Sequence, residues 1–203
     1  MEQPTPKLLL ATGNPGKARE LAELLKGAPF EMVSLQDLGL PTDIDEPADT
    51  FEGNAIIKAE AYARMSGLLT LADDSGLEID ALNGQPGVHS KRFAGEDATD
   101  EDRVQIVLQR LDGVPWEQRT ARYRCVLAIA KPGEGTVTCE GICSGIINRE
   151  LRGTGGFGYD PVFYLPEYDK TVAELSLEEK NQVSHRAKAA RQAVALLAER
   201  VDR

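Results

Sequence analysis

Two adjacent carboxylates, Asp73 and Asp74, follow directly after an apolar run at residues 68–72. The run predicts a buried strand, so the pair should lie at the carboxyl end of a strand, where α/β proteins place their ligands. Carboxylate oxygens ligate Mg²⁺ and orient or deprotonate water, and neighbouring residues of a strand point to opposite faces. One carboxylate could therefore serve chemistry while the other anchors the chain. The letters Asp-Asp-Ser-Gly are also ordinary in a solvated turn, and that alternative stays open here.

Residues 12–17 form a glycine-containing turn that ends in Lys17. An apolar run at residues 7–11 precedes the turn and helically spaced apolar residues follow it, which predicts strand, turn and helix. The first turn of a helix presents backbone N–H groups and the positive end of its dipole, so this segment suits a phosphate. It is not a Walker A loop, because Ala11 and Ala18 stand where that motif needs Gly and Ser or Thr. Gly and Asn also occur in such turns for conformational reasons alone.

An acidic loop at residues 43–49 precedes a helix that we predict for residues 50–65. Within the loop, Glu46 is the candidate for a further oxygen ligand, and Lys58 on the helix offers a positive charge. Acidic runs are more often a solvated face, and single helical lysines more often lie on the surface.

Residues 153–158 fit the letters of the dinucleotide-binding motif G-x-G-x-x-G. That motif must open a helix in a βαβ unit, whereas Pro161 and a strand-like segment follow here, so we reject it. Glycines beside Phe157 and Tyr159 instead predict a loop whose backbone approaches a flat ligand, with an aromatic ring that can stack on a base. A structural loop anchored by its aromatic residues is the alternative.

Lys180, His185 and Arg186 form a basic group near the C-terminus. Offsets of five and six residues rotate side chains by about 140° and 240° on a helix, so the three cannot share one helical face. Either they are unrelated surface charges or the helix breaks between them. Ser184 could cap a second helix, which would aim its first amides at a ligand.

The remaining elements must position these groups. We predict further strands at residues 31–34, 120–130, 136–141, 142–151 and 162–164, helices at residues 99–111 and 177–201, and a glycine-rich loop at residues 83–95. The turn at residues 131–135 predicts that the strands on either side of it pair as an antiparallel hairpin. No repeat or linker divides the chain, so we expect residues 1–203 to form one α/β domain with a mixed sheet.

The composition limits the partners and the location of the chain. With 33 Asp and Glu against 23 Lys and Arg, the net charge of −10 opposes a broad electrostatic grip on nucleic acid or an anionic membrane. The three cysteines include no C-x-x-C pair and predict buried thiols in a reducing compartment. Residues 1–7 lack the features of a signal peptide and no apolar run could cross a bilayer, so we expect a cytoplasmic protein.

Several motifs occur together in one order along the chain. They are Ala-Thr-Gly-Asn-Pro-Gly-Lys at 11–17, Thr-Phe-Glu-Gly-Asn-Ala at 50–55 with Lys58, Ala-Asp-Asp-Ser-Gly-Leu at 72–77, Pro-Gly-Val at 86–88, Phe-Ala-Gly-Glu at 93–96, the glycine loop at 153–161, Glu-Lys-Asn at 179–181 and Ser-His-Arg at 184–186. This combination resembles the inosine and xanthosine triphosphate pyrophosphatase family over nearly the whole chain.

The resemblance implies an enzyme that uses Mg²⁺ to hydrolyse ITP, dITP and XTP to the monophosphate and pyrophosphate, which cleanses the nucleotide pool. It also implies a long mixed central sheet with flanking helices, two lobes around an active-site cleft, and a homodimer. Lys91 departs from the Ala-Arg pair of that family, which leaves the role of Arg92 open.

Site residues follow from the resemblance position by position. The residues implied to hold the triphosphate are Thr12, Gly13, Asn14, Pro15, Gly16, Lys17, Lys58 and Lys180. Those implied to enclose the base are Phe157, Gly158, Tyr159, Asp160, His185 and Arg186. Glu46 and Asp74 would hold the metal, Asp74 would also be the catalytic base, Ser75 would touch the substrate, and Asp73 would give support.

The implied mechanism is attack of a water on the α-phosphorus, with positioning and charge neutralisation as the main contributions to catalysis. Two alternatives remain at this stage. One is a pyrophosphatase of similar architecture that removes modified pyrimidine or 7-methylguanine nucleotides. The other is a nucleotide-binding module without catalysis, against which the intact Asp73 and Asp74 pair argues.

Overall fold

Parallel strands β1 (Lys7–Ala11), β2 (Glu31–Ser34) and β3 (Leu69–Ile79) begin the sheet in this computed structural model, which describes residues 5–201. Residues 1–4, part of the N-terminal segment that is expected to lack a signal peptide, lie outside the described residues. Strands β4 (Thr120–Ala130), β5 (Val137–Ile147), β6 (Phe163–Leu165) and β7 (Lys170–Thr171) complete it. The strand order in the described residues is β2-β1-β3-β4-β5-β6-β7, and β5, β6 and β7 pair antiparallel. The predicted α/β fold with a mixed sheet is confirmed.

Contacts divide the chain into two units. Among the described residues, the first unit holds residues 5–74, 125–141 and 186–201, and the second holds Ser75–Arg124 and Ile142–His185. The unit boundary falls within β3, β4 and β5, and each unit has its own apolar core.

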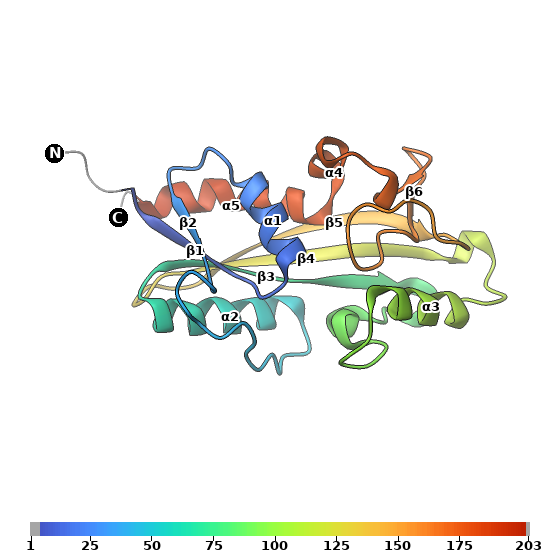
Figure 1. Cartoon of the computed structure of the whole chain (residues 1–203), viewed down its shortest axis with the longest axis horizontal. Helices are drawn as coiled ribbons and strands as arrows, with labels where there is room; N and C mark the ends of the chain where they lie inside the picture. Colours follow the sequence, from blue (N-terminus) through green and yellow to red (C-terminus); the bar gives the residue numbers. More distant parts are fainter. Residues whose placement is uncertain (1–4, 202–203) are drawn as a thin grey trace. The chain divides into compact units, whose positions relative to one another are not determined.

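Three helices cover the sheet residues of the first unit. α1 (Pro15–Leu24) and α5 (His185–Val201) lie on one face and α2 (Phe51–Ser66) lies on the other (Figure 1). Side chains of α1 and α5 such as Leu21 and Leu197 pack with Leu8, Leu71 and Leu127 of the strands. Thr50 caps α2 by accepting a hydrogen bond from Gly53 N, and the helix ends at Gly67 in the left-handed conformation.

In the second unit, α3 (Asp100–Arg110) and α4 (Leu177–Val183) lie on opposite faces of the strands (Figure 1). Thr99 caps α3, and the helix side chains Val104 and Val107 pack into a core with Tyr123 and Phe163. Short 3-10 helices at Asp80–Leu82, Gly87–Arg92, Trp116–Gln118 and Val172–Glu174 fill the connections. The predicted loop at residues 83–95 is therefore partly helical.

Two predicted strand boundaries were wrong. β3 does not end before Asp73 but continues to Ile79, because buried cations from distant segments neutralise both carboxylates of the pair. The segments predicted as separate strands at residues 136–141 and 142–151 form the single strand β5. Its Gly145 marks a close approach, since a Cβ there would lie 2.5 Å from the ring of Phe163.

The C-terminal helical region breaks at Ser184, the residue that could cap a second helix according to the sequence. Ser184 has extended backbone angles of −65° and 154° between α4 and α5, which sends Lys180 and His185 onto different helices. No helix within residues 5–201 is long and apolar enough to span a membrane.

Candidate active site

The turn between β1 and α1 is closed by its own side chains. The Asn14 carboxamide oxygen accepts hydrogen bonds from the backbone N–H groups of Gly16 at 2.8 Å and Lys17 at 3.1 Å. A Cβ on Gly13 would lie 2.4 Å from the carbonyl oxygen of Thr42, so only glycine fits there. Because Asn14 satisfies two of the first helical amides, the Lys17 ammonium is the strongest group that this turn offers to a phosphate.

Asp73 lies at the centre of a buried charge network on the α1 and α5 face of the sheet. Its carboxylate accepts hydrogen bonds from Lys17 Nζ at 2.5 Å and Arg186 Nε at 2.8 Å, and the Cys125 thiol lies 3.2 Å away. Arg186 also donates to Glu20 at 2.5 Å. Lys17 and Glu20 come from α1 and Arg186 from α5, so the network ties two helices to β3.

Asp74 points to the opposite face of β3, toward α2. Lys58 Nζ donates to Asp74 Oδ1 at 3.1 Å and to Glu46 Oε2 at 2.9 Å. Glu46 is half-buried, whereas Asp43, Asp45 and Asp49, the other acids of its loop, are exposed. The structure thus separates Glu46 from its neighbours and brings it to the same lysine as Asp74. We define the acidic-pair cluster as the following residues: Lys17, Glu20, Glu46, Lys58, Asp73, Asp74 and Arg186.

The pKa values of the two aspartates are shifted in opposite directions. Burial alone would raise the pKa of Asp73, but Arg186 and Lys17 outweigh burial and hold that pKa well below its usual value. Burial raises the pKa of Asp74, and the opposing charges of Lys58 and Lys17 do not cancel the rise. A pair of carboxylates whose pKa values are pushed apart is typical of acid–base sites, with Asp74 here as the group suited to accept a proton.

Asp74 and Glu46 also fit a hard divalent cation. Asp74 is only 7% exposed, and its Oδ2 is buried without a hydrogen-bond partner among residues 5–201. No group of three or more His, Cys, Asp or Glu side chains that could hold a metal occurs in the described part of the chain. Mg²⁺ is commonly bound by one or two carboxylates together with substrate phosphates and water, so two protein ligands are sufficient.

In the second unit, polar contacts within the loop at residues 157–160 and with other segments fix its conformation, including a hydrogen bond from Gly158 N to Asp100 at 2.7 Å. Asp160 Oδ2 accepts from Phe157 N at 3.0 Å and from Lys180 Nζ at 2.7 Å, and Oδ1 accepts from Tyr123 Oη at 3.1 Å. Tyr159 is buried, and its hydroxyl donates to the backbone oxygen of Ser90. Tyr159 therefore anchors the loop, which leaves the half-buried Phe157 as the ring that can stack on a base.

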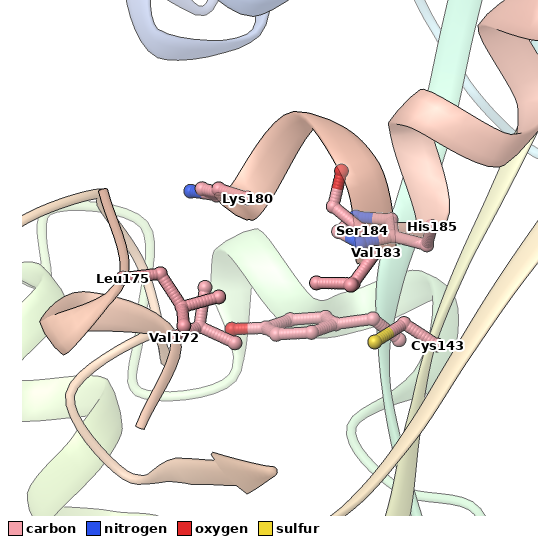
Figure 2. A pocket seen from close by; sticks show the side chains of 8 residues that line it. Cys143, Val172, Leu175, Lys180, Val183, Ser184 and His185 are labelled. Carbon is pink, nitrogen blue, oxygen red and sulfur yellow. The ribbon is translucent and has the colours of Figure 1, made fainter. Parts of the chain in front are cut away.

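His185 and Lys180 line a small cavity beside this loop, together with residues of β5 and of the segment before α4 (Figure 2). The imidazole of His185 stacks on Tyr123 with ring centroids 4.7 Å apart and an interplanar angle of 16°. The Lys180 ammonium lies 5.1 Å from the centre of the Phe157 ring. We call Tyr123, Phe157, Asp160, Lys180 and His185 the loop cluster.

The structure distributes the predicted site residues over these two clusters. Lys180, predicted beside the triphosphate, contacts Asp160 and Phe157 of the loop cluster. Arg186, predicted beside the base, is 1% exposed and bound to Asp73 and Glu20. The partners of Lys180 and Arg186 could not be predicted from the sequence, because they lie 20 or more residues away along the chain.

Other predicted positions lie near these groups. Ser75 is half-buried on β3 directly after Asp74, and Arg92 is exposed at the end of a 3-10 helix. Glu20 and Tyr123 were not predicted from the sequence as functional residues. The sequence indicated only that each residue lies near a buried face. Glu20 precedes the apolar Leu21, and Tyr123 belongs to the alternating pattern of β4. Cys125, Cys139 and Cys143 are buried thiols, as predicted.

Comparisons with known proteins identify relatives over nearly the whole chain. The sequence model of the Ham1 family matches residues 8–196. A dITP/XTP pyrophosphatase of Desulforamulus reducens is 54% identical over 94% of this chain and 95% of its own length, and one of Bacillus subtilis is 49% identical over 93% and 96%. The solved structure of a HAM1 protein from Coxiella burnetii aligns with a TM-score of 0.87 at 43% identity, covering 96% of this chain and 99% of that protein.

Proposed function

Because the chain belongs to the Ham1 family, we propose that it hydrolyses the non-standard purine nucleoside triphosphates ITP, dITP and XTP to the monophosphate and pyrophosphate, which cleanses the nucleotide pool. The names of its relatives support this activity. The observation that carries the proposal is the contrast within the acidic pair. Asp73 is held ionised by two cations, whereas Asp74 keeps a raised pKa and a buried oxygen that has no hydrogen-bond partner in the described part of the chain.

The acidic-pair cluster suits the triphosphate and a metal. Asp74 and Glu46 would hold Mg²⁺, which neutralises phosphate charge and polarises the phosphorus toward attack when it is bound. Lys17 and Lys58 would neutralise further phosphate oxygens, with residues 12–16 shaping the turn beneath them. Asp74 would orient a water and accept its proton as the water attacks the α-phosphorus and pyrophosphate departs.

Asp73 and Arg186 have a supporting part in this proposal. Asp73 bridges Lys17 to Arg186, so the network fixes the ammonium that faces the phosphates. The burial of Arg186 between two carboxylates favours this supporting part over direct contact with a base.

The loop cluster suits the purine base. Phe157 would stack on the ring, and the backbone of Gly158 and the side chains of Lys180 and His185 would lie at its edge. A 6-oxo purine presents an acceptor where adenine presents an amino donor, so N–H donors here favour hypoxanthine and xanthine and leave the adenine amino group without a partner. Tyr159 and Asp160 hold the loop, and Ser75 contacts the substrate beside Asp74.

Three further proposals accompany the activity. The family resemblance and the lack of a broad basic composition support a small-molecule substrate with no nucleic-acid partner. The same resemblance suggests a cytoplasmic homodimer. We also propose that the two units work as one catalytic domain.

The test is pyrophosphate release from ITP, dITP, XTP, ATP and GTP, each with Mg²⁺ and with the metal chelated. We expect release from the first three nucleotides only when Mg²⁺ is present. Equal rates on all five nucleotides would exclude the proposed base preference. Binding without any Mg²⁺-dependent release would instead indicate a nucleotide-binding module.

Asp74→Asn tests the catalytic base. Removing the proton acceptor and one anionic ligand should lower kcat by about 10²- to 10⁴-fold, while nucleotide binding stays measurable. Asp45→Asn makes the same chemical change on an exposed carboxylate of the Glu46 loop and should keep the wild-type rate. A near-normal kcat for Asp74→Asn would refute the role of Asp74.

A further inference from the structure

Tyr123 is the middle ring of a three-ring stack in the second unit. Its ring stacks on Phe163 at a centroid distance of 4.4 Å and on the imidazole of His185 at 4.7 Å. The interplanar angle is smaller on the His185 side, 16° against 30°. Tyr123 comes from β4 and Phe163 from β6, so the stack fixes the plane of the His185 ring from the strands of the sheet.

The hydroxyl of the same tyrosine reaches the loop at residues 157–160. It donates to Asp160 Oδ1, whereas Asp160 Oδ2 accepts from Lys180 Nζ and from the backbone N–H of Phe157. Because both carboxylate oxygens have donors, Asp160 is held against rotation about its χ2 angle. Tyr123 thus contacts two members of the loop cluster directly, His185 and Asp160, and reaches Lys180 and Phe157 through Asp160.

A purely structural role accounts poorly for this tyrosine. Tyr123 is 7% exposed and packs in the apolar core, where phenylalanine would fill the same space without a polar atom to satisfy. Burial and the Asp160 charge both raise its pKa well above the usual value, so the phenol stays protonated and remains a donor. Its hydroxyl is directed at Asp160, a carboxylate that orders the loop by accepting from the backbone N–H of Phe157.

We propose that Tyr123 is a positioning residue for base recognition, which sets the plane of His185 and the orientation of the Asp160 carboxylate that holds Lys180 and Phe157. The inference rests on the proposed function, because it assumes that the loop cluster binds the base. In this proposal Tyr123 does not contact the phosphates, which bind to groups of the acidic-pair cluster.

The experiment uses Tyr123→Phe, which removes one oxygen and keeps the stacked ring. Loss of a hydrogen bond to a charged group should raise KM for ITP roughly three- to tenfold, because Lys180 and Phe157 lose their fixed geometry. The value of kcat should change less than about twofold, since Asp74 and its neighbours keep their contacts. Inorganic tripolyphosphate, which has no base, should inhibit the variant and the wild type equally.

Tyr164→Phe is the matched control. This substitution removes a tyrosine hydroxyl that also donates to an aspartate in the same unit, Asp169 at 2.8 Å, and it leaves the contacts of Asp160 unchanged. KM, kcat and tripolyphosphate inhibition should all match the wild type in this variant. Thermal unfolding of both variants shows whether either change lowers stability.

Several results would overturn the inference. An unchanged KM for Tyr123→Phe would show that the hydroxyl does not position the base site. An equal loss of affinity for ITP and tripolyphosphate would indicate a general structural effect.

If the wild type releases no pyrophosphate from any nucleotide, the proposed function has failed, and calorimetric binding of inosine monophosphate then tests Tyr123 by itself. Weaker binding by the variant would support the positioning role, and equal binding or no binding to the wild type would exclude it.

Discussion

Replacing Arg186 by methionine removes the cation that joins two buried carboxylates. The guanidinium is 1% exposed and donates to Asp73 at 2.8 Å and to Glu20 at 2.5 Å. Methionine has a similar length and no charge, so the change tests the ion pairs more than the packing. If Arg186 mainly supports Asp73, as its contacts indicate, the variant should lose folding stability.

The size of the loss follows from what remains around the carboxylates. Removing one partner of a buried ion pair costs about 3–5 kcal/mol, because the other charge stays buried. Asp73 keeps Lys17 at 2.5 Å, which places the expected loss near the lower end, at about 3 kcal/mol. With an m-value of about 2 kcal/mol/M, the urea midpoint should fall by about 1.5 M.

The loss should depend on pH in a defined direction. The folded-state pKa of Asp73 is depressed, so its contribution to stability is present above its unfolded pKa of about 3.9 and is lost as the pH falls through the folded pKa. Without Arg186, burial raises the pKa of Asp73 relative to the wild type. The difference in stability between the wild type and Arg186→Met should therefore shrink as the pH falls below about 4, toward the folded-state pKa of Asp73 in the wild type.

Urea denaturation followed by circular dichroism at pH 7 and at a series of pH values below about 4 measures these effects. Arg64→Met is the control, because Arg64 forms an exposed pair with Glu60 at 3.8 Å that should contribute at most about 1 kcal/mol. A loss for Arg186→Met no larger than that of the control, or a loss that does not change with pH, would refute the supporting role of Arg186.

Two further predictions concern the second unit, and urea denaturation measures both. Arg119 is buried and donates to three backbone carbonyl oxygens, so Arg119→Met should cost about 3 kcal/mol, whereas the exposed control Arg149→Met should cost less than about 0.5 kcal/mol. Equal losses of stability in Arg119→Met and Arg149→Met would contradict the prediction for Arg119. Gly156 has a φ of +75°, and a Cβ there would lie 2.0 Å from Asp160 Oδ2, so Gly156→Ala should cost at least about 2 kcal/mol. Gly84→Ala, with a φ of +82° and open space, should cost about 1 kcal/mol, and a smaller loss at Gly156 would disprove the steric reasoning.

Local sequence determined the elements whose signals lie within a few residues. The bounds of β1, β2 and β4 agree with their hydrophobic patterns, and α2 and α3 begin within one residue of their predicted starts at Thr50 and Thr99. Capping and strand alternation depend on neighbours in the chain, so a sequence contains them directly. The pair Asp73 and Asp74 was also found from sequence, including the prediction that its members face opposite sides of a strand.

The pairing of charges could not be predicted in this way. Asp73 joins Lys17, which is 56 residues away, and Arg186, which is 113 residues away, and these partners let β3 continue through two buried carboxylates where the letters suggested a turn. Only the packing of α1 and α5 on one face and α2 on the other decides which cation reaches which oxygen. The sequence therefore identified the acidic pair, and tertiary structure made Asp73 an ion-pair anchor and left Asp74 with the raised pKa, because burial and charge depend on neighbours in space.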